Sequence, residues 1–426
     1  MITLKSSKKF GIALICVLTS LNIFGQRDNS KFKEIYNLIE KHNFFKAREL
    51  YDINRKSLQV DYQNFTEAIL NNAFNRLKES EEKIRLVNSD MENIPDSLRL
   101  KLYEVKKDNA IKLFNYKEAQ KTIDTILNAY REYLSPNEVT DLENDLKIWS
   151  AVQNIPAQKI NINKYTVLKM KKDLAGLNNL TVSSNQDTLN FIFDTGANLS
   201  TTSQSVAKRL KMKIIPVNIE VGTITGLKVL AQLAVGDSLK MGEISMHNII
   251  FLVLPDEAMA FPQINYQIYG ILGFPVIAAL EEIEISQEGD FIVTNKEADL
   301  SNSFEMAMNE LTPLIYIDGM HFTFDTGADK TIFYTSFYSE NSDEIDEKYQ
   351  PEKISFAGAG GQSEYEGFVI NYTLKNFGNP VTLKNIQLLK EKIKEDETVY
   401  GNIGRDLIQQ FNKMTINFER MLIKFE

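Results

Sequence analysis

The chain has 426 residues, of which 43% are hydrophobic and 25% charged, and this length predicts two or three globular domains. Its formal net charge of −9 at pH 7 argues against nucleic acid as a partner, because nucleic-acid binding needs a basic surface. The three histidines are scattered, and no phosphate-cradling loop occurs. We therefore expect neither a metal site nor a cofactor.

Residues 1–25 have the features of a signal peptide. Lysines near the start precede a mostly apolar run, residues 10–24, which is shorter than the roughly 20 residues of a transmembrane helix. We expect cleavage near Gly25, export to the periplasm or the cell exterior, and no transmembrane span in the mature chain. An uncleaved anchor is one alternative. Lipidation at Cys16, the only cysteine, is another, although Ile15 before it is larger than a lipoprotein signal requires.

Residues 27–153 are predicted to be helical, because apolar residues recur three and four positions apart and glycine and proline are rare. Within this region, residues 43–47 (Asn-Phe-Phe-Lys-Ala) resemble residues 115–119 (Asn-Tyr-Lys-Glu-Ala). Half of the distance between them is close to the period of tetratricopeptide repeats, roughly 34 residues, and the region is similar to a degenerate array of such helical hairpins. That similarity implies a concave surface for a protein partner. A plain helical bundle is the alternative.

After residue 154 the hydrophobic period changes to two, as expected for strands. We divide this part into a first lobe at residues 155–298 and a second lobe at residues 302–426, with the same order of elements in both. Asp318-Gly319 between two apolar runs predicts a two-residue hairpin. The expected strands cover residues 159–163, 167–170, 228–235, 248–254, 282–286, 290–294, 314–317, 320–324, 415–418 and 421–425, and short helices begin at Pro275 and cover residues 407–411.

One motif occurs twice in this β-rich part. Residues 194–197 (Asp-Thr-Gly-Ala) follow an apolar run, and residues 325–328 repeat the same four residues 131 positions later (325 − 194). Downstream of each copy lies a glycine that ends a short hydrophobic segment. These glycines, Gly273 and Gly404, are also 131 positions apart (404 − 273). Two motif pairs with one offset indicate an internal duplication.

This pattern resembles the signature of retropepsin-like aspartic proteases, and the resemblance covers about residues 155–426. It implies a multidomain α and β protein, in which an α-helical hairpin array precedes an all-β, duplicated, bilobal protease domain. It further implies that Asp194 and Asp325 are catalytic and that Thr195 and Thr326 each bond to the opposite loop. The residues expected to support the catalytic loops are Thr195, Gly196, Ala197, Gly273, Thr326, Gly327, Ala328 and Gly404.

The resemblance also implies an ion pair and two flaps. Asp329 and Arg405 in the second copy are expected to form a structural pair within one lobe, whereas the first copy has Asn198 and Phe274 at the matching positions. Retropepsins close glycine-rich hairpins over the substrate, which would exclude water and hold the peptide backbone. The residues expected at the flap tips are Gly222, Thr223, Ile224 and Gly226 in the first lobe, and Gly358, Ala359, Gly360 and Gly361 in the second.

Two neighbouring carboxylates have the chemistry to hydrolyse a peptide bond. Their like charges raise one pKa, so that the pair shares one proton. The ionised member removes a proton from water, while the protonated member polarises the carbonyl. We therefore predict an aspartic-type endopeptidase acting on peptides or proteins, with one chain as the active unit because both motifs are in it. The alternative is a peptide-binding or scaffold protein that uses the helical array and carries an inactive protease fold.

The fourth motif position, Ala197 and Ala328, carries no hydroxyl in either copy. A hydroxyl that donates to the ionised carboxylate lowers the pKa of the pair. The two alanines therefore predict a pH optimum less acidic than that of pepsin-type enzymes, which often carry Ser or Thr at this position.

Overall fold

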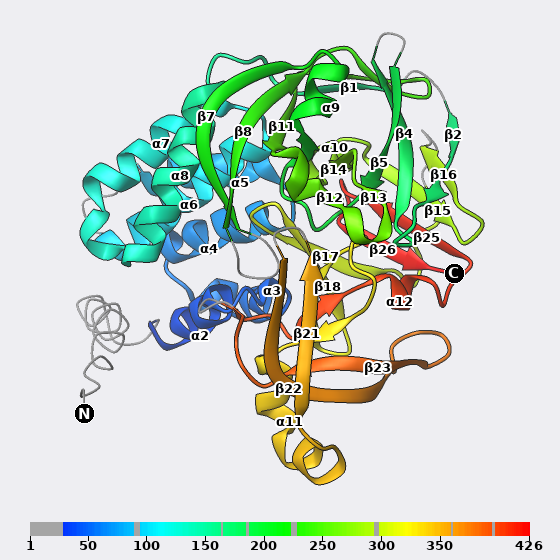
Figure 1. Cartoon of the computed structure of the whole chain (residues 1–426). Coiled ribbons are helices and arrows are strands. Elements are labelled where there is room, and N and C mark those ends of the chain that lie inside the picture. The colour runs from blue at the N-terminus through cyan, green and yellow to red at the C-terminus, as the bar shows by residue number, and fades with distance from the viewer. Residues whose placement is uncertain are drawn as a thin grey trace, which may run out of the picture. The chain divides into compact units, whose positions relative to one another are not determined.

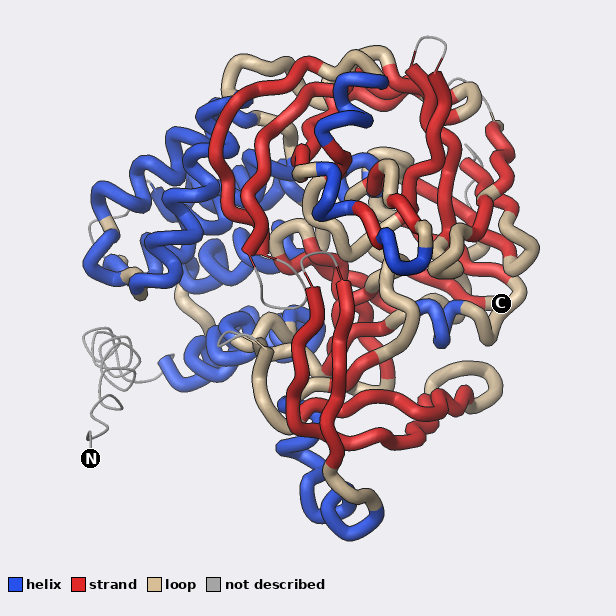
Figure 2. Tube along the Cα trace, in the orientation of Figure 1, coloured by secondary structure: helices blue, strands red, loops and turns tan. Residues whose placement is uncertain are grey.

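A computed structural model describes residues 29–88, 94–162, 165–184, 187–222, 228–293, 298–358, 361–393 and 397–426. The expected signal peptide lies outside these residues. The chain divides into two compact units, Met1–Asn154 and Ile155–Glu426 (Figure 1). The described part of the first unit is helical, whereas strands dominate the second (Figure 2). The predicted order, helices followed by a large β-rich region, is thus confirmed. No helix in the described part of the chain is both long and apolar enough to cross a membrane.

The first unit explains the short repeat seen in its sequence. Asn43 and Asn115 each cap a helix, and each side chain accepts a hydrogen bond from the backbone N–H three residues later, at 3.2 and 3.3 Å. Ala47 and Ala119 are fully buried in the first turns of these helices. The repeat therefore marks a helix start and its small core residue. The helices are α2 (Asn29–Glu40), α3 (Phe44–Asn54), α4 (Val60–Ala73), α5 (Leu77–Asn88), α6 (Asp96–Lys112), α7 (Tyr116–Ala129) and α8 (Pro136–Val152), with 3-10 turns η2 (Arg55–Ser57) and η4 (Arg131–Tyr133).

The second unit contains two large sheets in its described residues. The first sheet runs in the order β1-β10-β9-β4-β5-β14-β6-β11-β8-β7, and β3 pairs with β4. Its strands are β1 (Lys159–Asn161), β3 (Lys171–Lys172), β4 (Asn178–Ser184), β5 (Asp187–Phe193), β6 (Ser200–Ser203), β7 (Lys213–Gly222), β8 (Lys228–Gly236), β9 (Leu239–Met241), β10 (Ile244–His247), β11 (Ile249–Leu254) and β14 (Gly270–Leu272). A separate hairpin joins β12 (Ala260–Phe261) and β13 (Tyr266–Gln267), and the helices nearby in sequence are α9 (Gln204–Arg209), η5 (Asp256–Met259), η6 (Pro262–Ile264) and α10 (Phe274–Ala278).

The second large sheet runs in the order β2-β16-β15-β25-β26-β17-β18-β19-β24-β20-β23-β22-β21. Its strands are β2 (Thr166–Lys169), β15 (Glu282–Ser286), β16 (Asp290–Val293), β17 (Phe304–Asn309), β18 (Thr312–Ile317), β19 (Met320–Phe324), β20 (Ile332–Phe333), β21 (Glu352–Gly358), β22 (Gly361–Leu374), β23 (Val381–Leu389), β24 (Gly401–Ile403), β25 (Lys413–Asn417) and β26 (Leu422–Phe425). Helices α11 (Thr335–Lys348) and α12 (Arg405–Ile408) belong to the same half of the chain.

A run of strands in one sheet matches a run in the other, strand by strand. The order β4-β5-β14-β6-β11-β8-β7 corresponds to β18-β19-β24-β20-β23-β22-β21. The register agrees as well, because Phe193 pairs with Leu272 across β5 and β14, and Phe324 pairs with Ile403 across β19 and β24. Both members of the second pair lie 131 positions after those of the first (324 − 193 and 403 − 272), which is the offset of the sequence motifs.

The sheets do not follow the boundary between the two predicted lobes. Strand β15 pairs with β25, and β2 reaches the same sheet through β16. Strands β2, β15 and β16, all predicted within the first lobe, therefore belong to the sheet that continues into the second. Hydrophobic alternation locates such strands, but it carries no information about which distant strand each one pairs with.

Two local predictions had different outcomes. The hairpin at Asp318-Gly319 is present, with Ile317 opposite Met320 and positive φ angles of 53° and 81°, as a type I′ turn requires. The helix expected at residues 407–411 instead covers Arg405–Ile408. Gly404 is the N-cap of this helix, and the backbone N–H of its first residue, Arg405, donates to the carbonyl of Ala328 at 3.0 Å.

Candidate active site

Asp194 and Asp325 lie at the ends of two buried strands, β5 and β19. The backbone N–H of Asp194 donates to the carbonyl of Leu272 at 3.2 Å, and that of Asp325 donates to the carbonyl of Ile403 at 3.0 Å. These are the last ladder contacts before each chain turns. The two aspartates therefore occupy equivalent positions at the ends of matching strands in the two sheets.

The two carboxyl groups face each other across the motif glycines. A Cβ atom added to Gly196 would lie 2.5 Å from Cγ of Asp325, and one added to Gly327 would lie 2.5 Å from Cγ of Asp194. Any side chain at either position would displace the opposite carboxyl group. Each glycine N–H also donates to the aspartate of its own loop, at 2.8 Å. The glycines therefore allow the approach of the pair and orient each carboxylate.

Thr195 and Thr326 join the two catalytic loops. Each hydroxyl accepts a hydrogen bond from the other threonine's backbone N–H, at 3.0 Å. Each hydroxyl also donates to the opposite strand, Thr195 to the carbonyl of Phe324 at 2.9 Å and Thr326 to that of Phe193 at 3.0 Å. Both side chains are buried. Such bonds to the opposite loop were expected from the resemblance, and they hold the two loops together.

Gly273 and Gly404 lie directly against the backbone that follows each motif. An added Cβ would come within 2.5 Å of the carbonyl carbon of Leu199 at Gly273, and within 2.6 Å of that of Lys330 at Gly404. Their N–H groups donate to hydroxyls, Gly273 to Ser200 at 3.1 Å and Gly404 to Thr331 at 3.2 Å. The carbonyls of Ala197 and Ala328 accept from the residues after these glycines, Phe274 at 2.8 Å and Arg405 at 3.0 Å. Both glycines thus support the catalytic loops through close backbone contact.

Burial and the partner carboxyl group disfavour the charged form of Asp194. Burial raises the pKa of Asp194 well above its usual range, and the charge of Asp325 and a hydrogen bond with it raise that pKa further. Backbone N–H groups of Gly196 and Ala197 act in the opposite direction. Asp194 therefore keeps a proton at a pH at which an ordinary aspartic acid has lost it.

Asp329 and Arg405 form an ion pair with a separation of 2.6 Å, but the two side chains differ in burial. Arg405 has 5% of its side chain exposed, against 71% for Asp329. Arg405 also donates to the carbonyl oxygens of Gly176 and Ala175, which lie in the loop before β4. The arginine therefore connects the second motif to a segment of the first half, a contact that the sequence analysis did not anticipate.

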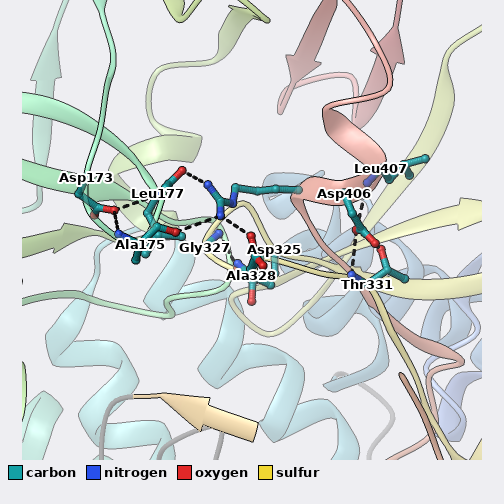
Figure 3. A network of polar contacts seen from close by, with 12 residues as sticks. Asp173, Ala175, Leu177, Asp325, Gly327, Ala328, Thr331, Asp406 and Leu407 are labelled. Carbon is teal, nitrogen blue, oxygen red and sulfur yellow. Dashed lines mark hydrogen bonds and ion pairs between the residues drawn. The ribbon is translucent and has the colours of Figure 1, made fainter. Parts of the chain in front are cut away.

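Asp173 gives that loop its shape. Its carboxylate accepts from the N–H groups of Ala175 at 3.0 Å and Leu177 at 2.9 Å, as Figure 3 shows. The resulting turn presents carbonyls to the guanidinium. An Asp-Leu-Ala-Gly turn is recognisable in the sequence, but its partner lies more than two hundred residues away.

The first copy uses the corresponding positions differently. Asn198 accepts a hydrogen bond from the hydroxyl of Thr312 at 3.2 Å. Phe274 is buried and packs edge-to-face on Phe418, with ring centroids 5.6 Å apart. Replacing both members of the ion pair leaves no charge buried without a partner.

The flap predictions concern two hairpins whose tips are only partly described. In the first, Gly222 pairs with Lys228 across β7 and β8. In the second, Gly358 pairs with Gly361 across β21 and β22. The remaining predicted flap residues, Thr223, Ile224, Gly226, Ala359 and Gly360, lie outside the described residues.

Two further residues lie beside Asp325, and their contacts with it were not expected from the sequence. The side-chain amide of Asn402 donates to Oδ2 of Asp325 at 3.5 Å. Tyr334 follows β20, and burial, the charge of Glu397 and the charge of Asp325 raise the pKa of its phenol. A position-by-position comparison of the two copies would have singled out Asn402, because Ile271 occupies its place in the first.

A family model described as aspartyl protease matches residues 180–276, a range that includes Asp194 and Gly273. The second unit thus contains an aspartic-protease-like domain. Solved structures with similarity include conglutin gamma from lupine seeds, at 9% identity and a TM-score of 0.37, covering 62% of this chain and 95% of that one. Soybean basic 7S globulin gives 10% identity and a TM-score of 0.38, covering 62% of this chain and 94% of that one. The comparison with curated proteins gave no match.

Proposed function

We propose that the chain is an exported aspartic endopeptidase, with Asp194 and Asp325 as its catalytic pair. The observation that carries the proposal is the mutual approach of the two carboxyl groups across Gly196 and Gly327. The paired hydrogen bonds of the motif threonines support it, because they hold the two loops in a fixed geometry. The matched strand orders support a duplicated, bilobal arrangement.

The chemistry follows from one proton shared by two carboxyl groups. The ionised aspartate removes a proton from a water molecule, whose oxygen attacks the carbonyl carbon of the peptide bond. The protonated aspartate donates to the carbonyl oxygen and so stabilises the tetrahedral intermediate. Collapse of this intermediate breaks the carbon–nitrogen bond, and a proton passes to the departing amine. This reaction needs a peptide and one water molecule.

The helical unit is the second part of the proposal. A tetratricopeptide-like surface there would recruit a substrate or dock a protein partner. Inhibition of the active site by this unit is the alternative role. Deletion of residues 27–153 separates the two, because loss of recruitment lowers cleavage of a protein substrate whereas loss of inhibition raises it. Cleavage of a short peptide serves as the control, since recruitment should not affect it.

The test of catalysis is peptide cleavage by the purified mature chain, followed by mass spectrometry from about pH 3 to about pH 8. Asp194→Asn and Asp325→Asn should each abolish cleavage. Asp343→Asn removes the same charge from an exposed position on α11 and should retain full activity. A wild-type chain that binds peptides but cleaves none across this range would support the scaffold alternative. Cleavage unchanged in both aspartate variants would overturn the proposed pair.

A further inference from the structure

One pair of facing strand residues next to the catalytic loops is apolar in the first half of the site and polar in the second. In the first half, Ile192 on β5 lies opposite Ile271 on β14. In the second half, Thr323 on β19 lies opposite Asn402 on β24, at the same register and the same offset of 131. Two apolar residues in one half thus correspond to two polar residues in the other. The paired change indicates that Thr323 and Asn402 act together.

The polar pair is ordered by a short hydrogen bond. The hydroxyl of Thr323 donates to Oδ1 of Asn402 at 2.6 Å. Because Oδ1 of the amide accepts this bond, Nδ2 is the atom that faces Asp325, and it lies 3.5 Å from Oδ2 of that residue. Asn402 is buried, with 5% exposure, so its amide depends on partners within the protein. Ile271 instead packs against a small apolar cluster of Ala231, Leu254 and Met259.

The result is an unequal set of donors around the two carboxyl groups. Asp325 receives the N–H groups of Gly327 at 2.8 Å and Ala328 at 3.1 Å on Oδ1, and the Asn402 amide on Oδ2. Asp194 receives backbone N–H groups from its own loop, among them that of Gly196 at 2.8 Å. Donors stabilise a carboxylate relative to its acid, and only Asp325 has one from Asn402.

We propose that Asn402, oriented by Thr323, is a positioning residue that keeps the negative charge on Asp325 and the shared proton on Asp194. This inference rests on the proposed protease function and extends it by assigning the two roles. Asp325 is the general base and Asp194 is the general acid. At the matching position of the first half, the side chain of Ile271 has no donor to offer.

The assignment gives a balanced reaction. The water oxygen bonds to the carbonyl carbon, its proton passes to Asp325, and the proton of Asp194 passes to the carbonyl oxygen. When the carbon–nitrogen bond breaks, Asp325 gives its proton to the amine. Asp194 then recovers a proton from a hydroxyl of the intermediate. The pair returns to its starting state, and the products are a carboxylic acid and an amine.

Other ionisable groups near Asp325 are the same with or without Asn402. Asp194 faces it from the opposite loop. Tyr334 feels the charges of both Asp325 and Glu397, and its raised pKa keeps the phenol neutral in the working range. Burial raises the pKa of Glu397 as well. A comparison of variants at Asn402 with the wild type therefore isolates the contribution of the amide.

The test is the double variant Thr323→Ile/Asn402→Ile, which copies the residue pair of the first half and removes the orienting hydroxyl and the amide together. Loss of the donor destabilises the charged form of Asp325, so the acidic limb of the kcat/KM profile should move up by roughly half to one pH unit. The alkaline limb, set by ionisation of Asp194, should stay in place. A matched control, Ile192→Val, should leave both limbs unchanged.

A second readout needs no turnover. Carbon-13 NMR of labelled aspartate carboxyls, assigned with Asp194→Asn and Asp325→Asn, should show a higher titration midpoint for Asp325 in the double variant. Should that variant fail to fold, Thr323→Val, which removes only the orienting hydroxyl, should shift both readouts in the same direction. An equal loss of activity at every pH, with both limbs of the kcat/KM profile and the Asp325 titration midpoint unchanged, would overturn the role of Asn402 but not the protease function. A wild-type chain that cleaves no peptide would instead overturn the protease function, while the midpoint still tests the role of Asn402.

Discussion

The hydroxyl of Thr195 accepts a hydrogen bond from the backbone N–H of Thr326 at 3.0 Å, and the hydroxyl of Thr326 accepts one from the N–H of Thr195 at the same distance. Neither loop can move without breaking contacts of the other. The aspartates next to these threonines are thereby held in one geometry before any substrate binds, as preorganised catalysis requires.

Removing one hydroxyl should loosen this connection. Thr326→Val removes the acceptor for Thr195 N–H and the donor to Phe193, leaving two buried polar groups without partners. We expect a loss of about 2–4 kcal/mol in the free energy of unfolding and a large fall in activity. Urea denaturation followed by circular dichroism measures the first quantity. Thr326→Ser keeps the hydroxyl and should behave nearly as the wild type. Equal destabilisation by both variants would contradict this role.

A methyl group at Gly196 should disable the site without unfolding the chain. Gly196→Ala places a carbon 2.5 Å from Cγ of Asp325, so the carboxyl group must shift. A displacement of about 1 Å can cost on the order of 100-fold in rate. The matched control is Gly378→Ala, where an added Cβ meets nothing within 4 Å. Peptide cleavage and thermal unfolding should be measured together, because activity lost in step with stability would point to misfolding.

The Asp329–Arg405 pair should be asymmetric in its energetics. Asp329 is largely exposed and Asn keeps an oxygen that accepts from the buried Arg405, so Asp329→Asn should cost about 1–2 kcal/mol. Arg405→Met should cost roughly 2–4 kcal/mol, because it removes a buried donor from the carbonyls of Gly176 and Ala175. Chemical denaturation of both variants and of the double variant gives the coupling between the two residues. Equal costs for the two single variants would show that the ion pair matters more than the contact with the loop.

The contact of Arg405 with the loop before β4 could not be predicted from the sequence, whereas other features could. The repeated motif at Asp194 and Asp325 was readable because duplication leaves a fixed offset, and the Asp318-Gly319 hairpin was readable because a tight turn depends on local residue types. The contact of Arg405 with Gly176 joins residues 229 positions apart. Nothing local to either residue specifies such a contact, since it arises only when the sheets have formed.

The same reasoning applies to the sheet pairing and to Asn402. Alternation predicted strands near Thr166 and Asp290, but not that they pair with each other and join the sheet of the C-terminal hairpin. In the sequence, Asn402 is one residue of the short segment that ends at Gly404, and its residue type alone indicates no role. Its amide contact with Asp325 became visible only from coordinates, because it depends on the direction of a side chain within a strand.

The raised pKa of Asp194 should appear in the dependence of stability on pH. Its folded pKa lies above the unfolded value of about 3.9, so the folded state binds more protons and stability falls as pH rises from that value through the folded pKa. Asp194→Asn removes this loss and should be more stable than the wild type at neutral pH. The difference should shrink as the pH falls toward about 4. Denaturation midpoints across pH measure it, with Asp343→Asn as the control. Parallel stability curves for Asp194→Asn and the wild type would contradict the pKa shift.

The alanines at the fourth motif position should set the acidic limit of activity. Ala328 contributes only its backbone N–H to Asp325, at 3.1 Å. In Ala328→Ser, an added hydroxyl that donates to the ionised carboxylate lowers its pKa, and the acidic limb of the kcat/KM profile should extend by roughly half to one pH unit to lower pH. Ala197→Ser should have a smaller effect on that limb, because its neighbour Asp194 holds the proton. Pepsin-type pairs that work in strong acid have an optimum of roughly pH 2. A wild-type optimum at that pH would contradict the expectation from the two alanines.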